Sequence, residues 1–90
     1  MSRTVVESVP LLRWVFQQRR QVVTCAVDVA DGGTSFDVSL VPHWNLSDTT
    51  IESFKTAASA FARHAEIAMK LRQGGWAVDR QMPVAHPTAA

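Results

Sequence analysis

The sequence has one cysteine, no long apolar run and almost no net charge, and each of these absences excludes a class of protein. With Cys25 alone, the chain cannot form an internal disulfide. No apolar run approaches ~18 residues, and the N-terminus lacks the basic start and apolar core of a signal peptide. Nine basic and eight acidic residues leave no overall field that would favour nucleic acid or an anionic membrane. We therefore expect a cytoplasmic protein without a membrane segment.

The residue patterns of metal and catalytic sites are also lacking. The three histidines, His43, His64 and His86, do not share the spacing of a metal pair, and no cysteine or carboxylate cluster completes a site. No arrangement of Ser, His and Asp predicts nucleophilic catalysis. Cys25 is expected on the core side of a strand, where a free cysteine acts as a small buried hydrophobe. We predict no metal ligand, no cofactor and no catalytic residue.

What the chain does have is the composition of one folded domain. Its 90 residues are 47% hydrophobic and 19% charged, which is typical of a globular protein. From Pro83 onward the sequence PVAHPTAA lacks any periodicity. We predict a single domain over residues 1–82 and a disordered tail over residues 83–90.

The stretch Gln21–Pro42 has the alternation of a β-hairpin. Val23, Cys25 and Val27 fall on one face, with Phe36, Val38 and Leu40 after the turn. Between the two runs stands Asp31-Gly32, a pair that accepts the positive φ angles of a two-residue type I′ turn. Such a turn pairs Val27 with Phe36 and Cys25 with Val38, and places these apolar residues on one face.

The preceding segment, Ser8–Gln18, has two interpretations. Leu12, Trp14 and Phe16 alternate with their neighbours, which favours a strand. An amphipathic helix stays open as the alternative, because Pro10 is tolerated in a first helical turn. If the segment is a strand, a connection over Gln18–Gln21 places Trp14 opposite Cys25 and Phe16 opposite Val23.

A long helix is predicted to follow the hairpin. Thr49 and Glu52 have the spacing of a capping box, and Gly74-Gly75 marks the end. The apolar residues at helical spacing are Ile51, Phe54, Ala58, Phe61, Ala65 and Ala68. After the glycines, Trp76 either plugs the core or begins a short fourth strand. The predicted fold class is α+β: an antiparallel three-stranded meander, with a possible short fourth strand, packed on one long C-terminal helix.

Surplus apolar side chains carry the functional prediction. One helix covers one face of the sheet, so the other face meets solvent or a partner, and monomers seldom expose large apolar patches. The residues expected at an interface are Val15, Val22, Thr24, Ala26 and Val41 on that face, with Ile67 and Leu71 on a second stripe of the helix. We predict a small non-catalytic protein-interaction module that forms a homodimer or binds another protein.

Two alternatives remain at this point. A nucleic-acid-binding module requires one surface that gathers Arg13, Arg19, Arg20, Lys70 and Arg72. A small-ligand binder or an enzyme requires a pocket around His43, Trp44 and Trp76.

Overall fold

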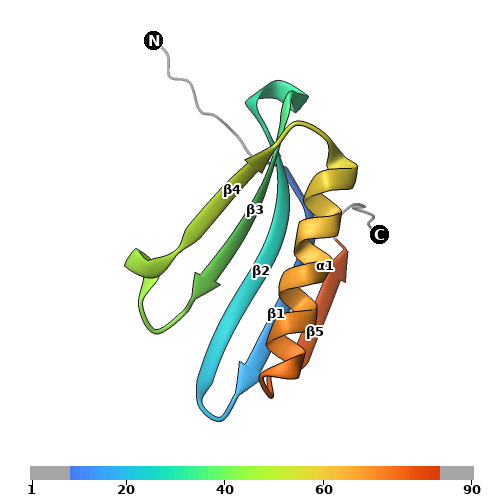
Figure 1. Cartoon of the computed structure of the whole chain (residues 1–90). Coiled ribbons are helices and arrows are strands. Elements are labelled where there is room, and N and C mark those ends of the chain that lie inside the picture. Colours follow the sequence, from blue (N-terminus) through green and yellow to red (C-terminus); the bar gives the residue numbers. More distant parts are fainter. Residues whose placement is uncertain (1–8, 84–90) are drawn as a thin grey trace, which may run out of the picture.

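A five-stranded antiparallel sheet carries one helix on one of its faces (Figure 1). The computed structural model describes residues 9–83. In chain order the elements are β1 (Val9–Gln18), β2 (Gln21–Ala30), β3 (Ser35–Pro42), β4 (Thr50–Phe54), α1 (Ala57–Gln73) and β5 (Ala77–Pro83). The strands lie in the order β4-β3-β2-β1-β5, which confirms the α+β class. Residues 1–8 of the predicted domain and residues 84–90 of the predicted tail lie outside the described residues. Pro83, predicted as the first residue of the tail, is instead the last residue of β5.

The first segment is a strand, as the alternation favoured. Its register with β2 is the predicted one, with Trp14 opposite Cys25 and Phe16 opposite Val23. The connection is shorter than expected, because Gln18 and Gln21 already pair and only two residues form the turn. The first of these, Arg19, has a φ of 57°.

The β2–β3 hairpin keeps the predicted faces, but its predicted register is wrong by two residues. Val27 pairs with Val38, and Cys25 pairs with Leu40. The loop is longer than a type I′ turn: Asp31, Gly32 and Gly33 have φ angles of 54°, 67° and 99°, and Thr34 closes the loop on the Asp31 carbonyl. Because side chains alternate with a period of two, a shift of two residues leaves every side chain on its own face.

The predicted start of the helix is wrong, because Thr50–Phe54 forms strand β4 beside β3. Helix α1 has 17 residues and begins after Thr56, whose hydroxyl accepts a hydrogen bond from the Ser59 amide at 3.1 Å. Glu52 does not close a capping box at Thr49, since its carboxylate instead binds a side chain of α1. Backbone pairing to β3 thus prevailed over a local capping pattern.

The predicted rotation of the helix is also wrong. Its buried residues are Ala60, His64 and Ala68, whereas Phe61, predicted at the centre of the core face, is 39% exposed. The predicted orientation of the apolar face depended on counting Ile51 and Phe54 as helical, but both residues belong to strand β4. Without them, the face that meets the sheet is the stripe that includes Ile67 and Leu71, both packed against the core.

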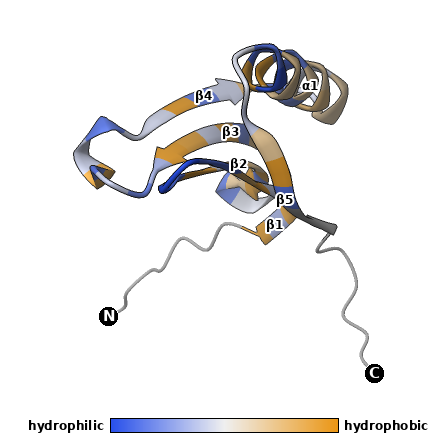
Figure 2. Ribbon diagram, turned by 90° about the horizontal axis from the view of Figure 1, so that it is seen from below, coloured by the Kyte–Doolittle hydropathy of each residue, from blue (hydrophilic) through white to orange (hydrophobic). Residues whose placement is uncertain are grey.

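The last segment forms an edge strand, β5, which pairs with β1. Helix α1 therefore leads the chain from the β4 edge of the sheet to the β5 edge (Figure 1). The largest fully buried side chains are Phe16, Val27, Val38 and Cys25, all on the face beneath α1. Figure 2 shows α1 on one side of the curved sheet and no described element on the other. None of the helices in residues 9–83 is long and apolar enough to cross a membrane.

Candidate functional site

The sheet face turned away from α1, here called the outer face, displays a set of residues from four strands. The ladder and the alternation of side chains assign to it Arg13, Val15, Val22, Thr24, Ala26, Asp28, Asp37, Ser39, Val41 and Ile51. The five sheet residues predicted at an interface are all among them. The other two, Ile67 and Leu71, lie on the opposite side of the sheet and contact the core from α1.

The centre of the outer face is apolar. Val15, Thr24 and Val41 stand directly opposite one another on β1, β2 and β3, and all three are partly exposed. In the next row Ala26 is 4% exposed, whereas Ile51 at the β4 edge is 62% exposed. Partly exposed valines on a sheet face that no described element covers depart from the polar surface of a solvated sheet.

One end of the outer face is acidic. Asp28 and Asp37 stand opposite each other on β2 and β3. The hydroxyls of Ser53 and Ser35 donate to Asp37 Oδ1 at 2.8 and 3.3 Å. Asp28 Oδ1 is buried without a hydrogen-bond partner among the described residues. Burial raises the pKa of the Asp28 carboxyl, Arg13 opposes this rise, and Asp37 adds to it.

The other end of the outer face is basic. The turn between β1 and β2 consists of Arg19 and Arg20, both exposed. His43, just after β3, lies with Nε2 2.7 Å from the Thr24 hydroxyl. Val22 and Asp28 are six positions apart on β2, so the two ends of the face are about 20 Å apart. The face is thus apolar at its centre and carries opposite charge at its two ends.

The five basic residues of the nucleic-acid alternative do not share one surface. Arg13 is on the outer face, and Arg19 and Arg20 are at its end. Lys70 and Arg72 belong to α1, on the other side of the sheet, and they line different hollows there. The continuous basic track that a phosphate backbone requires is therefore not formed by these residues.

The predicted pocket around His43, Trp44 and Trp76 is divided between the two faces. His43 hydrogen-bonds to Thr24 on the outer side. Trp44, the next residue, instead stacks on Trp76, with ring centroids 6.2 Å apart and planes inclined by 20°. The stack joins the segment after β3 to the residue that precedes β5.

Beside this stack runs a groove between α1 and β3, here called the α1–β3 groove. Its volume is about 290 Å³, and its lining consists of Leu40, Arg63, Ile67, Lys70, Leu71, Gly74 and Trp76. Leu40, Arg63 and Gly74 are lining residues that belonged to none of the sites predicted from the sequence. The spacing of positions 63, 67, 70, 71 and 74 was the available signal, since these residues follow one helical stripe.

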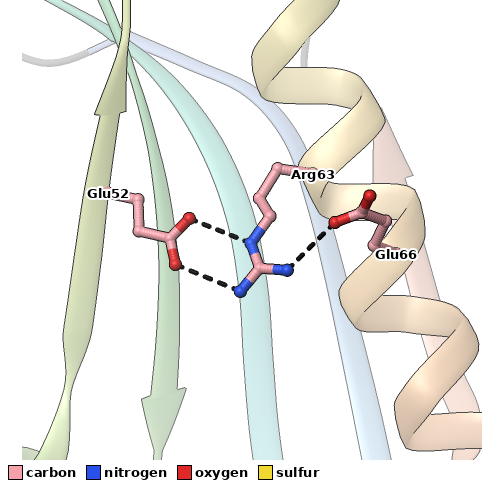
Figure 3. A network of polar contacts seen from close by, with 3 residues as sticks. All are labelled: Glu52, Arg63 and Glu66. Carbon is pink, nitrogen blue, oxygen red and sulfur yellow. Dashed lines mark hydrogen bonds and ion pairs between the residues drawn. The ribbon is translucent and has the colours of Figure 1, made fainter.

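Arg63, which lines the groove, joins α1 to β4 (Figure 3). Its Nε and one terminal nitrogen donate to the two carboxylate oxygens of Glu52 at 2.9 and 3.2 Å, and the other terminal nitrogen donates to Glu66 at 3.0 Å. The hydrogen bonds to Glu52, and then that to Glu66, raise the pKa of the Arg63 guanidinium. The bidentate geometry fixes the distance between the helix and the β4 edge.

A second hollow lies on the opposite flank of α1. Its volume is about 450 Å³, and its described lining is Trp14, Ala65, Ala68, Met69, Arg72 and Gln73. Met69 is 53% exposed beside it. Its polar side chains among the described lining residues are one arginine and one glutamine, whereas the α1–β3 groove has an arginine and a lysine.

Cys25 and the candidate metal ligands are the remaining reactive groups within residues 9–83. Burial raises the pKa of the Cys25 thiol to about 12, so the thiolate that a nucleophile requires is suppressed at neutral pH. No three histidine, cysteine or carboxylate side chains of the described chain could hold a metal ion together. His86 lies outside that part of the chain.

No family model, curated protein or solved structure matches this chain. Its function is therefore inferred from its own residues.

Proposed function

We propose that the protein is a non-catalytic interaction module that forms a homodimer through its outer face. The observation that carries the proposal is the row Val15, Thr24 and Val41, which no described element covers. An apolar centre with polar ends is the usual anatomy of an interface. A second copy supplies a matching surface, because a two-fold dimer uses the same patch on both subunits.

The charges of the outer face favour one orientation of the two copies. A two-fold axis in the interface, perpendicular to the strands, places each acidic end over the partner's basic end. Val22 then faces Asp28 of the partner subunit, and His43 faces Asp37 of the partner subunit. An axis parallel to the strands instead brings the acidic ends together. Like charges across an interface cost several kcal/mol, so we infer the perpendicular axis.

The size of the face predicts a weak dimer. Five strands at about 4.8 Å spacing and a usable length of about 20 Å give a flat area of about 500 Å² on each copy. Two such areas fall at the low end of specific interfaces, where complexes are transient. We therefore expect a dissociation constant in the micromolar range, and weaker association at high salt, which screens the end charges.

Sedimentation tests the proposal directly. Between about 5 and 500 μM, the average mass of the purified chain should rise from monomer towards dimer. A chain that stays monomeric at about 500 μM overturns the homodimer, and leaves the face to solvent or to a different protein.

A matched pair of variants tests the orientation. Val15→Lys sets an ammonium group against Arg13 of the partner subunit and should weaken the dimer about tenfold, whereas Val22→Lys sets the same group against Asp28 of the partner subunit and should tighten it. If both variants weaken association, the perpendicular axis is wrong. If neither changes it, the outer face is not the interface. Circular dichroism establishes that both variants are folded.

A further inference from the structure

We propose that the α1–β3 groove binds a small amphipathic carboxylate, with the apolar body on the leucines and Trp76 and the carboxylate on Lys70. The floor and walls are apolar over Leu40, Ile67 and Leu71. The Trp76 ring, held in place by its stack on Trp44, adds a flat apolar wall. Such a lining, with a few fixed polar groups, is typical of small-molecule sites.

The charge in the groove comes from one residue. Arg63 also lines it, but Glu52 and Glu66 already neutralise that guanidinium. Lys70 forms no ion pair with any described residue and is exposed, so its ammonium group remains available. Arg63 and Lys70 are seven residues apart, about 10.5 Å along the helix axis, so one small anion meets Lys70 without displacing the ion pair.

The groove selects a monoanion of modest size. Lys70 lies in the last turn of α1, where the negative end of the helix dipole opposes every anion, and opposes a doubly charged phosphate more strongly than a singly charged carboxylate. The volume of about 290 Å³ equals that of about ten water molecules, so a ligand body of about ten non-hydrogen atoms fills it. A medium-chain fatty acid or an aromatic carboxylic acid has these properties.

Octanoate and 1-octanol are suitable probes, because they share the chain and differ in the charge. The readout is the indole N–H signals in ¹H–¹⁵N spectra of the full chain, each assigned with a Trp→Phe variant. Octanoate should shift the Trp44 and Trp76 signals saturably, while Trp14, which lines the other hollow, stays unmoved. Because an ionic hydrogen bond contributes about 1.5 kcal/mol, 1-octanol should bind about tenfold more weakly.

The two lysines of the described chain form a matched control. Lys70→Gln should weaken the binding of octanoate about tenfold. Lys55→Gln makes the same change at a residue that does not line the groove, and it should leave the affinity for octanoate unchanged. Equal affinity for octanoate and 1-octanol, or unchanged binding by Lys70→Gln, overturns the carboxylate assignment. The absence of saturable shifts at Trp44 and Trp76, or a shift confined to Trp14, overturns the site.

The groove and the proposed dimer interface are on opposite sides of the sheet, so their tests are independent. Octanoate should leave the monomer–dimer distribution in sedimentation unchanged. If Lys70→Gln loses octanoate binding and keeps the dimer, the result supports the groove and says nothing of the dimer interface. If Val15→Lys loses the dimer, it should still bind octanoate.

Discussion

The His64 imidazole Nε2 lies 3.2 Å from the main-chain carbonyl oxygen of Cys25, and this contact joins the buried face of α1 to the central strand β2. A carbonyl only accepts, so Nε2 carries the proton of the neutral ring. The ring also meets Trp14 edge-on, with centroids 5.3 Å apart at 85°. His64 is 3% exposed, so the helix position depends on a polar group that must stay neutral.

This contact predicts a loss of stability in acid. Burial lowers the pKa of His64 below its ordinary value of 6.5, and the hydrogen bond to Cys25 only partly opposes the shift. Below pH 6.5 the His64 ring therefore binds its proton more readily in the unfolded state than in the folded state. The contribution of His64 to the free energy of unfolding falls as the pH falls from 6.5 towards the folded pKa. Urea denaturation between about pH 5 and 8 measures this slope.

The control for this prediction is His64→Gln, which keeps a side-chain N–H donor but does not titrate. The variant should lose the His64 part of the slope, since every other titrating group is unchanged. Identical pH dependence of the two proteins would mean that His64 has the same pKa in the folded and unfolded states.

Asp28→Asn should stabilise the isolated chain at pH 7 by about 0.5–1 kcal/mol, because it removes a charge that burial disfavours and that Asp37, directly opposite on the neighbouring strand, repels. The raised pKa of Asp28 gives the sign: the folded state holds this proton more tightly than the unfolded state does, so the wild type recovers stability as the pH falls towards the ordinary value of 3.8. Denaturation at about 5 μM, below the expected dimer range, is the measurement.

The same variant should weaken the proposed dimer, in which Asp28 faces the basic end of the partner subunit. Asp37→Asn is the comparison: it also removes the like-charge pair, but it weakens the acceptor of two serine hydroxyls and should stabilise less. No gain in stability from Asp28→Asn would place Asp28 in contact with solvent rather than in a desolvated position.

Phe16→Ala should cost about 3–5 kcal/mol, the usual loss for a fully buried phenylalanine. Phe61→Ala should cost about 1–2 kcal/mol, because its side chain is 39% exposed. Midpoints of urea unfolding separate the two variants. If the Phe61 variant is as unstable as the Phe16 variant, Phe61 is a core residue, as the helical periodicity of the sequence predicted.

Gly32→Ala should destabilise by about 1–2 kcal/mol, since a φ of 67° crowds a Cβ atom against the following carbonyl although no other part of the chain lies near it. Gly74→Ala is the matched control, because the φ of −85° at Gly74 suits an alanine and its Cβ meets other atoms only at ordinary contact distance. Thermal unfolding of both proteins compares them. Equal stability would mean that the loop rearranges at no cost.

The sequence alone determined which residues share a face of each strand. Alternation is a local property of the extended chain, so Cys25 and Val27 beneath the helix and Val15, Thr24 and Val41 on the outer face followed without any knowledge of the pairing. Even the wrong register of the β2–β3 hairpin preserved these faces. The candidate interface on the sheet was therefore predictable from residue types and order.

Only the tertiary structure decided which of the local sequence patterns were formed and which were replaced by non-local pairing. Thr49 and Glu52 satisfy a capping rule, but the unpaired edge of β3 offers Thr50–Phe54 a ladder of backbone hydrogen bonds, and that non-local gain decided the element. The rotation of α1 followed from the same choice, since its N-cap is Thr56 rather than Thr49, seven residues later than the pattern suggested. The stack of Trp44 on Trp76, and the groove beside it, depend on two segments that are far apart in the sequence. These segments, after β3 and before β5, become adjacent only when the helix has packed on the sheet.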